Sequence, residues 1–282
     1  MPERSSSARH VVVGTDFSPA SDDAVDRAIR IAKQNGAKLH VVHGSGRLPA
    51  LFSRRFHVDK KHVERDLRAV VARARAEDVR GAAHHVETGA TKALRDMARE
   101  LGACLVVVGS RGRSVPDTFV GSTAERIATL SRVPVLLVRR SGHGRYREVV
   151  VAVDFAPKLD ASLEAARFVA PNAELSILHA YQGPFETRLR LHGAGDADIA
   201  SHRKDARRQA RAQLLPLLAE AGLAPGALVL RHGDPRRILH GLPKESLVVV
   251  QRGSVIAHAL VGSVTRSVIA YGRSDVLISP SA

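Results

Sequence analysis

Two glycines and a helix start lie close together in one stretch of the chain, at a spacing that can hold a phosphate group. A Val-rich run ends at Gly109, Gly112 follows in the next turn, and Gly121 opens a helical segment. Glycine lets the backbone approach a ligand closely. The first turn of a helix offers unpaired N–H groups and a favourable dipole to an anion.

Polar side chains accompany this backbone. Ser122 and Thr123 add hydroxyl donors, and the guanidinium groups of Arg111 and Arg113 can meet phosphate charge. An ordinary strand–loop–helix connection has the same composition, with glycines in its turns and a hydroxyl residue at the helix start, so both interpretations stay open. The segment is not a P-loop, because no Gly-Lys-Ser/Thr follows.

A second candidate lies near the N-terminus, where Thr15 and Asp16 follow another Val-rich run. A carboxylate at the end of a strand can accept hydrogen bonds from a ribose or a base. It can equally hold a turn or cap the helix that follows. Asp154 occupies the corresponding place later in the chain, which favours a shared structural task.

The elements that must position these residues alternate between strands and helices. Ser18 can cap a helix whose first residue is Pro19, and Gly36 can end that helix. This alternation predicts a doubly wound α/β fold with a parallel sheet, whose ligands lie at the carboxyl ends of the strands. Short Val-rich runs predict strands at 10–14, 38–43, 82–87, 104–109 and 134–138.

The pattern occurs twice. The run 11–17 (Val-Val-Val-Gly-Thr-Asp-Phe) returns as 149–155 (Val-Val-Val-Ala-Val-Asp-Phe), and 120–123 returns as 261–264. A repeat of about 140 residues indicates two domains rather than a solenoid. We therefore predict a first domain at 1–140, a Gly-rich basic linker at 141–147 and a second domain at 148–282.

Histidines and the single cysteine are weaker candidates. Neighbouring strand residues point to opposite faces, so His84 and His85 cannot share one metal ion, and His40 and His43 also alternate. We expect core or strand-end histidines and no metal. Cys104 opens a predicted strand, and we expect it to be buried and unreactive.

Composition narrows the function. The chain has 282 residues, 44% of them hydrophobic and 25% charged, which is typical of globular domains. We find no apolar run long enough to span a membrane and no signal peptide, and one cysteine fits a reducing cytoplasm. Only 4% are aromatic, with no Trp, which disfavours base-stacking platforms. The net charge of +15 fits either a polyanionic partner or an Arg-rich composition.

Together these motifs resemble those of the universal stress protein family, in two copies that cover nearly the whole chain. The run 13–18 (Val-Gly-Thr-Asp-Phe-Ser) resembles the first-strand signature of the family. Its nucleotide loop is matched at Gly109, Gly112, Gly121 and Ser122. The resemblance implies a flavodoxin-like, five-stranded sheet in each domain and an intrachain pseudo-dimer, with possible homodimers. It also implies an adenine nucleotide between the first and fourth strands and a regulatory rather than catalytic role.

The chain departs from the family pattern in two ways. Eight residues separate Gly112 from Gly121, where the family has nine. In the second copy Gln251 stands in the place of Gly109, and Val153 replaces the hydroxyl of Thr15. We therefore predict that the first domain binds nucleotide and that the second is a degenerate copy.

Our leading interpretation is a cytoplasmic stress-response regulator that binds ATP, with Mg²⁺ or Mn²⁺ as a possible companion, and at most hydrolyses it slowly. The predicted binding residues are Thr15, Asp16, Gly109, Arg111, Gly112, Gly121, Ser122 and Thr123. The alternative is a scaffold without a nucleotide site, whose basic surface meets an acidic protein partner or nucleic acid. A phosphoryl-transfer enzyme is disfavoured, because neither a Walker-type lysine nor paired metal carboxylates appear.

Overall fold

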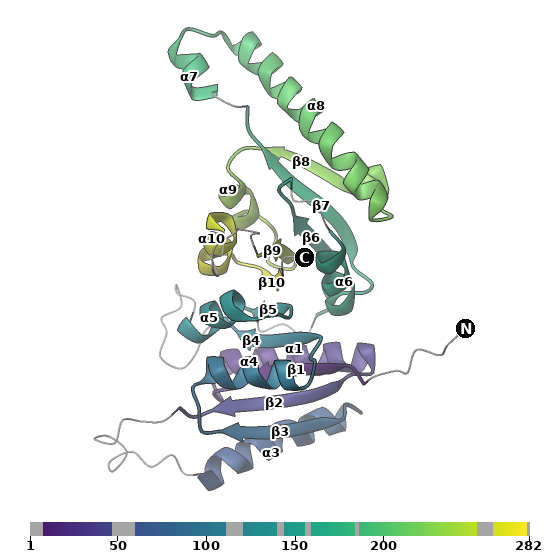
Figure 1. Ribbon diagram of the computed structural model, residues 1–282, viewed down its shortest axis with the longest axis vertical. Coiled ribbons are helices and arrows are strands. Elements are labelled where there is room, and N and C mark those ends of the chain that lie inside the picture. Colours follow the sequence, from purple (N-terminus) through teal and green to yellow (C-terminus); the bar gives the residue numbers. More distant parts are fainter. Residues whose placement is uncertain are drawn as a thin grey trace.

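The computed structural model describes residues 8–46, 60–110, 121–139, 144–155, 159–183, 186–252 and 262–280. Within these residues, ten strands form one continuous sheet that runs the length of the molecule (Figure 1). The first half contributes β1 (His10–Gly14), β2 (Lys38–Gly44), β3 (Gly81–Val86), β4 (Leu105–Gly109) and β5 (Val135–Val138). The second contributes β6 (Glu148–Ala152), β7 (Glu174–Tyr181), β8 (Leu228–His232), β9 (Leu247–Gln251) and β10 (Asp275–Ser279).

The strand order is β3-β2-β1-β4-β5-β10-β9-β6-β7-β8. Every pair within a half is parallel, and only β5 and β10, which join the halves, are antiparallel. Each half is therefore a five-stranded parallel sheet, and the halves meet edge to edge. The predicted fold class is confirmed.

The helices cover both faces of this sheet, as the doubly wound prediction requires. The first half has α1 (Pro19–Asn35), α3 (Lys60–Ala76), α4 (Ala90–Glu100) and α5 (Ser122–Leu130). The second has α6 (Asp160–Val169), α7 (Glu186–Leu191), α8 (Asp196–Glu220), a short 3₁₀ turn (Pro225–Ala227), α9 (Pro235–His240) and α10 (Ser263–Tyr271). Helices α1, α3, α6 and α8 pack in the core on one face, and α4, α5, α9 and α10 in the core on the other. Among the described residues, no helix combines the length and the apolarity needed to cross a membrane.

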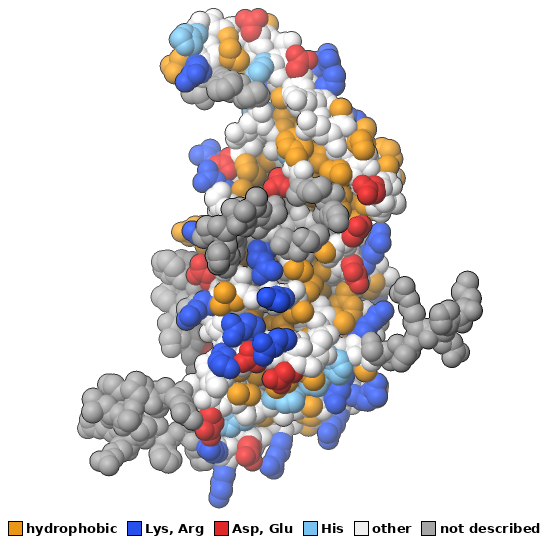
Figure 2. Space-filling model, in the orientation of Figure 1, with side chains coloured by type: hydrophobic (Ala, Val, Ile, Leu, Met, Phe, Trp, Pro, Cys, Tyr) orange, Lys and Arg blue, Asp and Glu red, His pale blue; other side chains and the backbone are white. Residues whose placement is uncertain are grey.

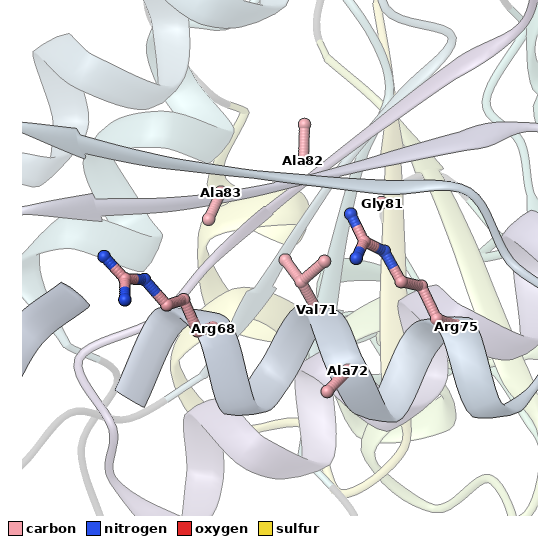
Figure 3. Close-up of a pocket in the computed structure, with 7 residues that line it drawn as sticks. All are labelled: Arg68, Val71, Ala72, Arg75, Gly81, Ala82 and Ala83. Atoms are coloured by element: carbon pink, nitrogen blue, oxygen red, sulfur yellow. The ribbon is translucent and has the colours of Figure 1, made fainter. Parts of the chain in front are cut away.

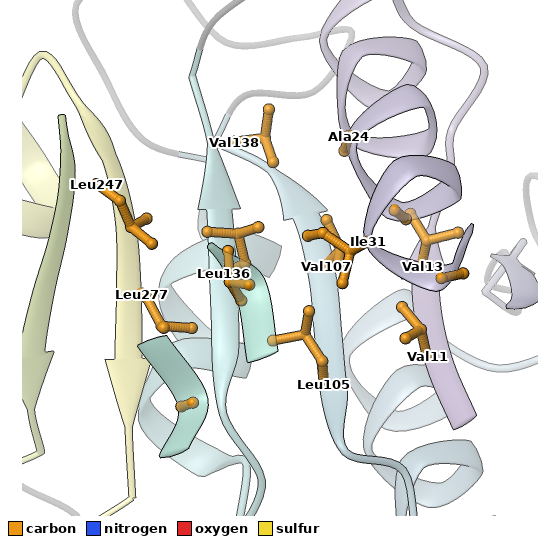
Figure 4. Packing of buried hydrophobic residues seen from close by; sticks show 14 of the residues in the cluster. Val11, Val13, Ala24, Ile31, Leu105, Val107, Leu136, Val138, Leu247 and Leu277 are labelled. Atoms are coloured by element: carbon orange, nitrogen blue, oxygen red, sulfur yellow. The ribbon is translucent and has the colours of Figure 1, made fainter. Parts of the chain in front are cut away.

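The cores are continuous across the boundary between the halves. Successive side chains of a strand point to opposite faces of the sheet. In β1, Val11 and Val13 therefore face α1, while Val12 faces the opposite helix layer. Leu136 of β5 and Leu277 of β10 are fully buried in the same cluster (Figure 4). Because this apolar layer is not interrupted at the β5–β10 seam, the two halves share one buried core on each face.

The first helix begins and ends where the sequence predicts. The Ser18 hydroxyl accepts the Ser21 N–H at 3.3 Å, Pro19 is the first helical residue, and Gly36 ends α1 with a φ of 59°. This left-handed conformation suits glycine, which has no Cβ to clash with the preceding carbonyl. The capped ends fix the position of α1 relative to β1, and hence that of the turn between them.

The predicted strands of the first half each coincide with one of β1 to β5 to within one residue at either end. On the helices, Val63, Leu67 and Val70 of α3 and Leu94 and Ala98 of α4 are buried. The exact domain boundaries stay a prediction. In the structure β5 ends at Val138 and β6 begins at Glu148.

A buried carboxylate lies at the junction of the halves. Asp275 of β10 is 1% exposed and accepts the backbone N–H of Arg139 at 2.8 Å and the Tyr146 hydroxyl at 2.5 Å. Arg27 of α1 forms an ion pair with it at 3.7 Å, donates to the carbonyl of Gly144 at 2.7 Å and lies over the Tyr146 ring. The Asp275 carboxylate thus contacts α1 of the first half as well as Arg139 and Tyr146, which lie between β5 and β6.

Two arginines add contacts across the seam, each at the C-terminal end of a helix in the other half. Arg139 donates to the carbonyls of Val268, Ile269 and Gly272 at the end of α10. Arg252 donates to the carbonyls at the end of α5, with the Thr129 oxygen 3.1 Å away. A cation stabilises this end of a helix because the last carbonyls lack intrahelical partners and the dipole is negative there.

Removing the charge of Asp275 tests how much the junction depends on it. We expect Asp275→Asn to lower the free energy of unfolding by about 3 kcal/mol, because it leaves the Arg27 charge buried without a counterion. Urea unfolding followed by circular dichroism measures this loss. The matched control is Glu77→Gln, which removes the carboxylate of an exposed pair with Lys33 and should change stability little. Equal effects of the two substitutions would contradict the role assigned to Asp275.

Candidate functional site

The predicted binding residues that the structure describes lie where the winding of the first half reverses. The chain leaves β1 for α1 on one face of the sheet and leaves β4 for α5 on the other. Val13 pairs with Val107, so Thr15 and Gly109 stand at the neighbouring ends of these two strands. A crevice between the carboxyl ends of such strands is where doubly wound proteins bind ligands.

Thr15 and Asp16 organise the turn after β1. The Thr15 side chain is buried, with its hydroxyl 3.1 Å from that of Ser21 and accepting the Phe17 N–H at 3.0 Å. One carboxylate oxygen of Asp16 accepts the N–H of Ser18 at 3.1 Å and its hydroxyl at 2.5 Å. Of the two structural alternatives for Asp16, this oxygen therefore holds the turn, and Ser18 caps the helix. Any ligand contact of Asp16 has to coexist with it.

Gly109 has a packing role that the sequence did not reveal. A Cβ atom built at this position would lie 2.5 Å from the carbonyl oxygen of Ala20 and 3.2 Å from the N atom of Ser21. The first turn of α1 thus crosses directly over the end of β4. Glycine is needed here for the protein's own backbone, whether or not a ligand also approaches.

The second half differs from the first both at the residue equivalent to Gly109 and in the start of its first helix. Gln251 stands where the first half has Gly109. Helix α1 begins at the third residue after Asp16, whereas α6 begins at the sixth residue after Asp154. The later start of α6 therefore accompanies the replacement of glycine by glutamine at the end of β9.

The start of α5 is tied to the end of β4. The N–H of Gly121 donates to the carbonyl of Ser110 at 2.8 Å, and the N–H of Ser110 donates to that of Val138 at 2.8 Å. Since the Gly121 N–H is used, the amides that α5 can offer to an anion are those of the residues that follow it. Thr123 lies in this first turn and is half-buried. Arg111, Gly112 and Arg113 lie outside the described residues, and so does the side chain of Ser122.

An aromatic pair next to Asp16 was missed in the sequence. Phe17 has a φ of 60°, and its ring packs on that of His43 with centroids 4.8 Å apart. His43 donates its Nδ1–H to the carbonyl of Thr15 at 2.9 Å. This hydrogen bond and the stacked ring hold the turn in its left-handed conformation, which is uncommon for a bulky residue.

The same pair occurs in the second half. Phe155 packs on His179 at 4.6 Å, and His179 Nδ1 lies 2.9 Å from the carbonyl oxygen of Val153. Both pairs were present in the repeat as Phe and His at equivalent places. Because the half without a Gly109 equivalent keeps the pair, its first task is structural, and it stiffens the end of the strand in each half.

Three histidines form a diagonal row on the α4 face of the sheet. His10 Nδ1 and His40 Nε2 are 2.9 Å apart, and His40 Nδ1 and His84 Nε2 are 3.0 Å apart. His43 and His85 lie on the other face, as the alternation of strand residues predicts. Figure 2 shows histidines gathered at the surface of the first half over the β1–β2 region. Among the described residues, no cluster of three or more His, Cys, Asp or Glu side chains could hold a metal ion.

The middle histidine of this row is kept neutral. Burial, followed by the neighbouring His84, His10 and Lys38, lowers the pKa of His40 to about 4. Burial and Lys38 also lower the pKa of His84. A neutral imidazole can donate through one nitrogen and accept through the other, which a chain of ring-to-ring hydrogen bonds requires.

The prediction of a buried Cys104 was wrong. The cysteine is partly exposed, and it precedes the first residue of β4 rather than opening the strand. Its N–H donates to the carbonyl of His10 at 2.9 Å. It lies outside the candidate site.

The fold is that of a doubly wound α/β protein with two similar halves in tandem. The candidate ligand site lies in the first half, at the carboxyl ends of β1 and β4. The model of the Universal stress protein family matches residues 7–139 and again residues 145–280. The chain belongs to this family, as the resemblance implied, and contains two copies of its domain.

Similar proteins agree with this assignment. Universal stress protein G of Escherichia coli O157:H7 is 35% identical over 127 residues, which cover 42% of this chain and 89% of that protein. Universal stress protein A homolog 1 of Coxiella burnetii is 28% identical over 137 residues, 46% of this chain and 95% of its own. A crystal structure of a universal stress protein from Archaeoglobus fulgidus covers 97% of this chain and 98% of its own, with a TM-score of 0.63 and 16% identity. That last likeness shows a shared two-domain fold.

The packing role of Gly109 leads to a stability prediction. We expect Gly109→Ala to lower the free energy of unfolding by about 1–3 kcal/mol, because the added methyl group must displace the first turn of α1. The control is Gly89→Ala, since a Cβ there meets nothing within 4 Å and the φ of −59° suits any residue. Chemical denaturation of both variants measures the difference. If Gly109→Ala were as stable as Gly89→Ala, the close approach of α1 would be refuted.

The lowered pKa of His40 predicts a dependence of stability on pH. Below pH 6.5 the unfolded chain protonates this histidine, whereas the folded chain does so only near pH 4. Stability is therefore fully present above pH 6.5 and falls as the pH drops through this window, by about 3 kcal/mol for the single group. We expect His40→Gln to flatten this slope in urea unfolding between pH 4 and 7, and the exposed control His192→Gln to leave it unchanged. A slope unaffected by His40→Gln would contradict the assignment.

Proposed function

We propose that the first half binds an adenine nucleotide, ATP, between the ends of β1 and β4, and that the protein acts as a stress-response regulator. The observation that carries the proposal is the meeting of two groups at one switch point. The carboxylate of Asp16 follows β1, and the N-terminal turn of α5 is tied to the end of β4 through Ser110. An acceptor for ribose or base thus stands beside amides and hydroxyls suited to phosphate.

Each predicted residue has a place in this proposal. Thr15 and Asp16 would contact the nucleoside. The amides and hydroxyls of Ser122 and Thr123 would hold the phosphates, with Gly121 fixing the helix start. In the family pattern Gly109 and Gly112 complete the loop. Arg111 would meet the phosphate charge, and Mg²⁺ or Mn²⁺ would accompany it.

The second half supports the choice of the first. Its Gln251 occupies the place of Gly109, and Val153 lacks the hydroxyl of Thr15. Arg252, which follows Gln251, donates to carbonyl groups of α5 in the other half. These substitutions fit a copy retained for assembly rather than for ligand binding.

Regulation rather than catalysis fits the chemistry of the site. Asp16 is the one candidate base among the predicted binding residues, and one of its oxygens already holds Ser18. We therefore propose at most slow hydrolysis, in the cytoplasm. A bound nucleotide would act by favouring one conformation around the start of α5, which the Gly121–Ser110 hydrogen bond ties to β4, and so alter a surface that a protein partner meets.

A second candidate function has its own support. Both the Asp16 oxygen and the Gly121 N–H already have protein partners, and the loop between Gly112 and Gly121 is one residue short of the family pattern. A first half closed to nucleotide would leave an interaction scaffold with a basic surface.

Calorimetric titration with MgATP distinguishes the two functions. We expect about one site per chain, weakened at least about tenfold by Asp16→Asn, which corresponds to about 1.4 kcal/mol. Asparagine keeps the oxygen that accepts from Ser18 and removes only the charge and the second acceptor. Asp154→Asn is the matched control in the second half and should bind like the wild type.

Other outcomes would overturn parts of the proposal. Two sites per chain, or loss of binding in Asp154→Asn alone, would mean that the second half is a functional site. Absence of heat, or heat that vanishes at 0.5 M salt and ignores Asp16, would favour the scaffold, because non-specific attraction is screened by salt.

A further inference from the structure

An open groove lies at the outer edge of the first half, between α3 and β3. Its volume is about 520 Å³, and its apolar surface includes Val71 and Ala72 of α3 and Ala83 of β3. Arg68 and Arg75 extend from α3 at its two ends (Figure 3). The groove is separated from the proposed nucleotide site by β2, so it is independent of that function.

The strand that borders this groove has one edge that pairs with no described strand. Among the described residues, β3 is the first strand of the sheet and pairs only with β2. The Leu39 N–H donates to the carbonyl of Arg80 at 2.8 Å. The Ser45 N–H donates to the carbonyl of Val86 at 3.1 Å. Even-numbered residues of β3 therefore direct their peptide groups to β2.

The odd-numbered residues of the strand direct their peptide groups outward. Gly81, Ala83 and His85 thus present N–H and C=O groups along the open edge. Exposed edges are usually blunted by a charged residue, a proline or a bulge, yet β3 is Gly-Ala-Ala-His-His-Val. The small residues leave room for another backbone and its side chains beside the strand.

The two arginines supply charge at a defined separation. They are seven residues apart on α3, so their Cα atoms are about 10.5 Å apart on the same side of the helix. Arg75 forms no ion pair with any described residue. Arg68 pairs with Glu64 at 3.2 Å, but both side chains are largely exposed, and such a pair exchanges readily with another carboxylate.

We propose that this groove binds an extended acidic segment of a partner protein, which adds to β3 as a further strand and places its carboxylates on Arg68 and Arg75. The backbone groups of Gly81, Ala83 and His85 supply the hydrogen bonds. The arginines select the charge, in the manner of other β-augmentation sites.

Charge and composition exclude the other occupants. At the opposite edge of the sheet, β8 carries Arg231, and its neighbour α8 carries a run of exposed arginines, including Arg207 and Arg211. Pairing β3 with β8 of a second copy would bring two basic surfaces together in a chain of charge +15. Nucleic acid is disfavoured because none of the described residues that line the groove is aromatic, so they offer no platform for bases. Figure 2 shows Lys and Arg side chains along the β3–α3 end of the molecule.

Fluorescence anisotropy with the full chain tests the proposal. The probe is a labelled seven-residue peptide that alternates Glu and Val, and the comparison peptide alternates Lys and Val. We expect saturable binding of the Glu peptide, weakened at least tenfold in Arg68→Gln/Arg75→Gln. Arg207→Gln/Arg211→Gln on α8 removes the same charge elsewhere and should bind as the wild type does.

Two further measurements test strand addition itself. Ala83→Pro removes an outward N–H without touching the β2–β3 ladder, and it should weaken binding at least tenfold. A Glu-Val peptide methylated at alternate backbone nitrogens should fail to bind the unchanged protein, which avoids any effect on folding. Hydrogen exchange should show new protection at Ala83 and His85 when the unmethylated peptide is bound.

The proposal is overturned if the α8 control weakens binding as much as the α3 variant, since the attraction would then be general. It is also overturned if the methylated peptide binds normally. Tighter binding of a single-stranded oligonucleotide that depends on Arg68 and Arg75 would assign the groove to nucleic acid instead. Peptide-independent dimers abolished by Ala83→Pro would assign it to a second copy of the chain.

Discussion

The carboxylate of Asp275 is the contact on which the arrangement of the two halves depends. It is buried at the seam between β5 and β10, where it binds the backbone of Arg139, the hydroxyl of Tyr146 and the guanidinium of Arg27. Burial and the nearby Asp275 hold the pKa of Tyr146 well above its usual value, so the phenol stays a donor. A buried charge is tolerated only when it is paired, so these groups stabilise one another or not at all.

The antiparallel seam has a consequence for function. Strands within each half are parallel, whereas β5 and β10 run in opposite directions. The strands of the two halves therefore point in opposite directions. Their carboxyl ends lie on opposite sides of the continuous sheet, and one ligand cannot contact both. The connection between the halves runs instead through Arg139 and Arg252, each of which binds the last carbonyls of a helix in the other half. The first turn of α5 is part of the proposed phosphate site, so a shift of α5 would change the hydrogen bonds of Arg252.

Local patterns predicted more of this fold than of its site. The caps of α1 and the valine-rich strands depend on residues that are close in the sequence, and both appear in the structure. The repeat appears as two halves with the same order of strands. Strand order and register depend on contacts between distant segments, so the row of His10, His40 and His84 was not foreseeable from spacing. The Phe17–His43 pair was missed because a bulky residue with positive φ is rare, although its recurrence in both copies was a usable signal. The burial of Cys104 was misjudged: the residue lies just before β4 and is partly exposed, although its neighbour Ala103 is buried.

Gly109 and Gln251 show how one constraint separates the two copies. In the first half α1 starts immediately after the Asp16 turn and crosses the end of β4, which only glycine allows. In the second half α6 starts later after its aspartate, and a glutamine stands at the end of β9. Glycine at 109 is therefore no evidence for a ligand by itself. The case for a nucleotide in the first half rests on what lies beside Gly109, namely Asp16 and the start of α5. The second half keeps its strand-end Phe155–His179 pair, and its Arg252 binds the end of α5 across the seam, so these contacts support the proposal that this copy is retained for assembly.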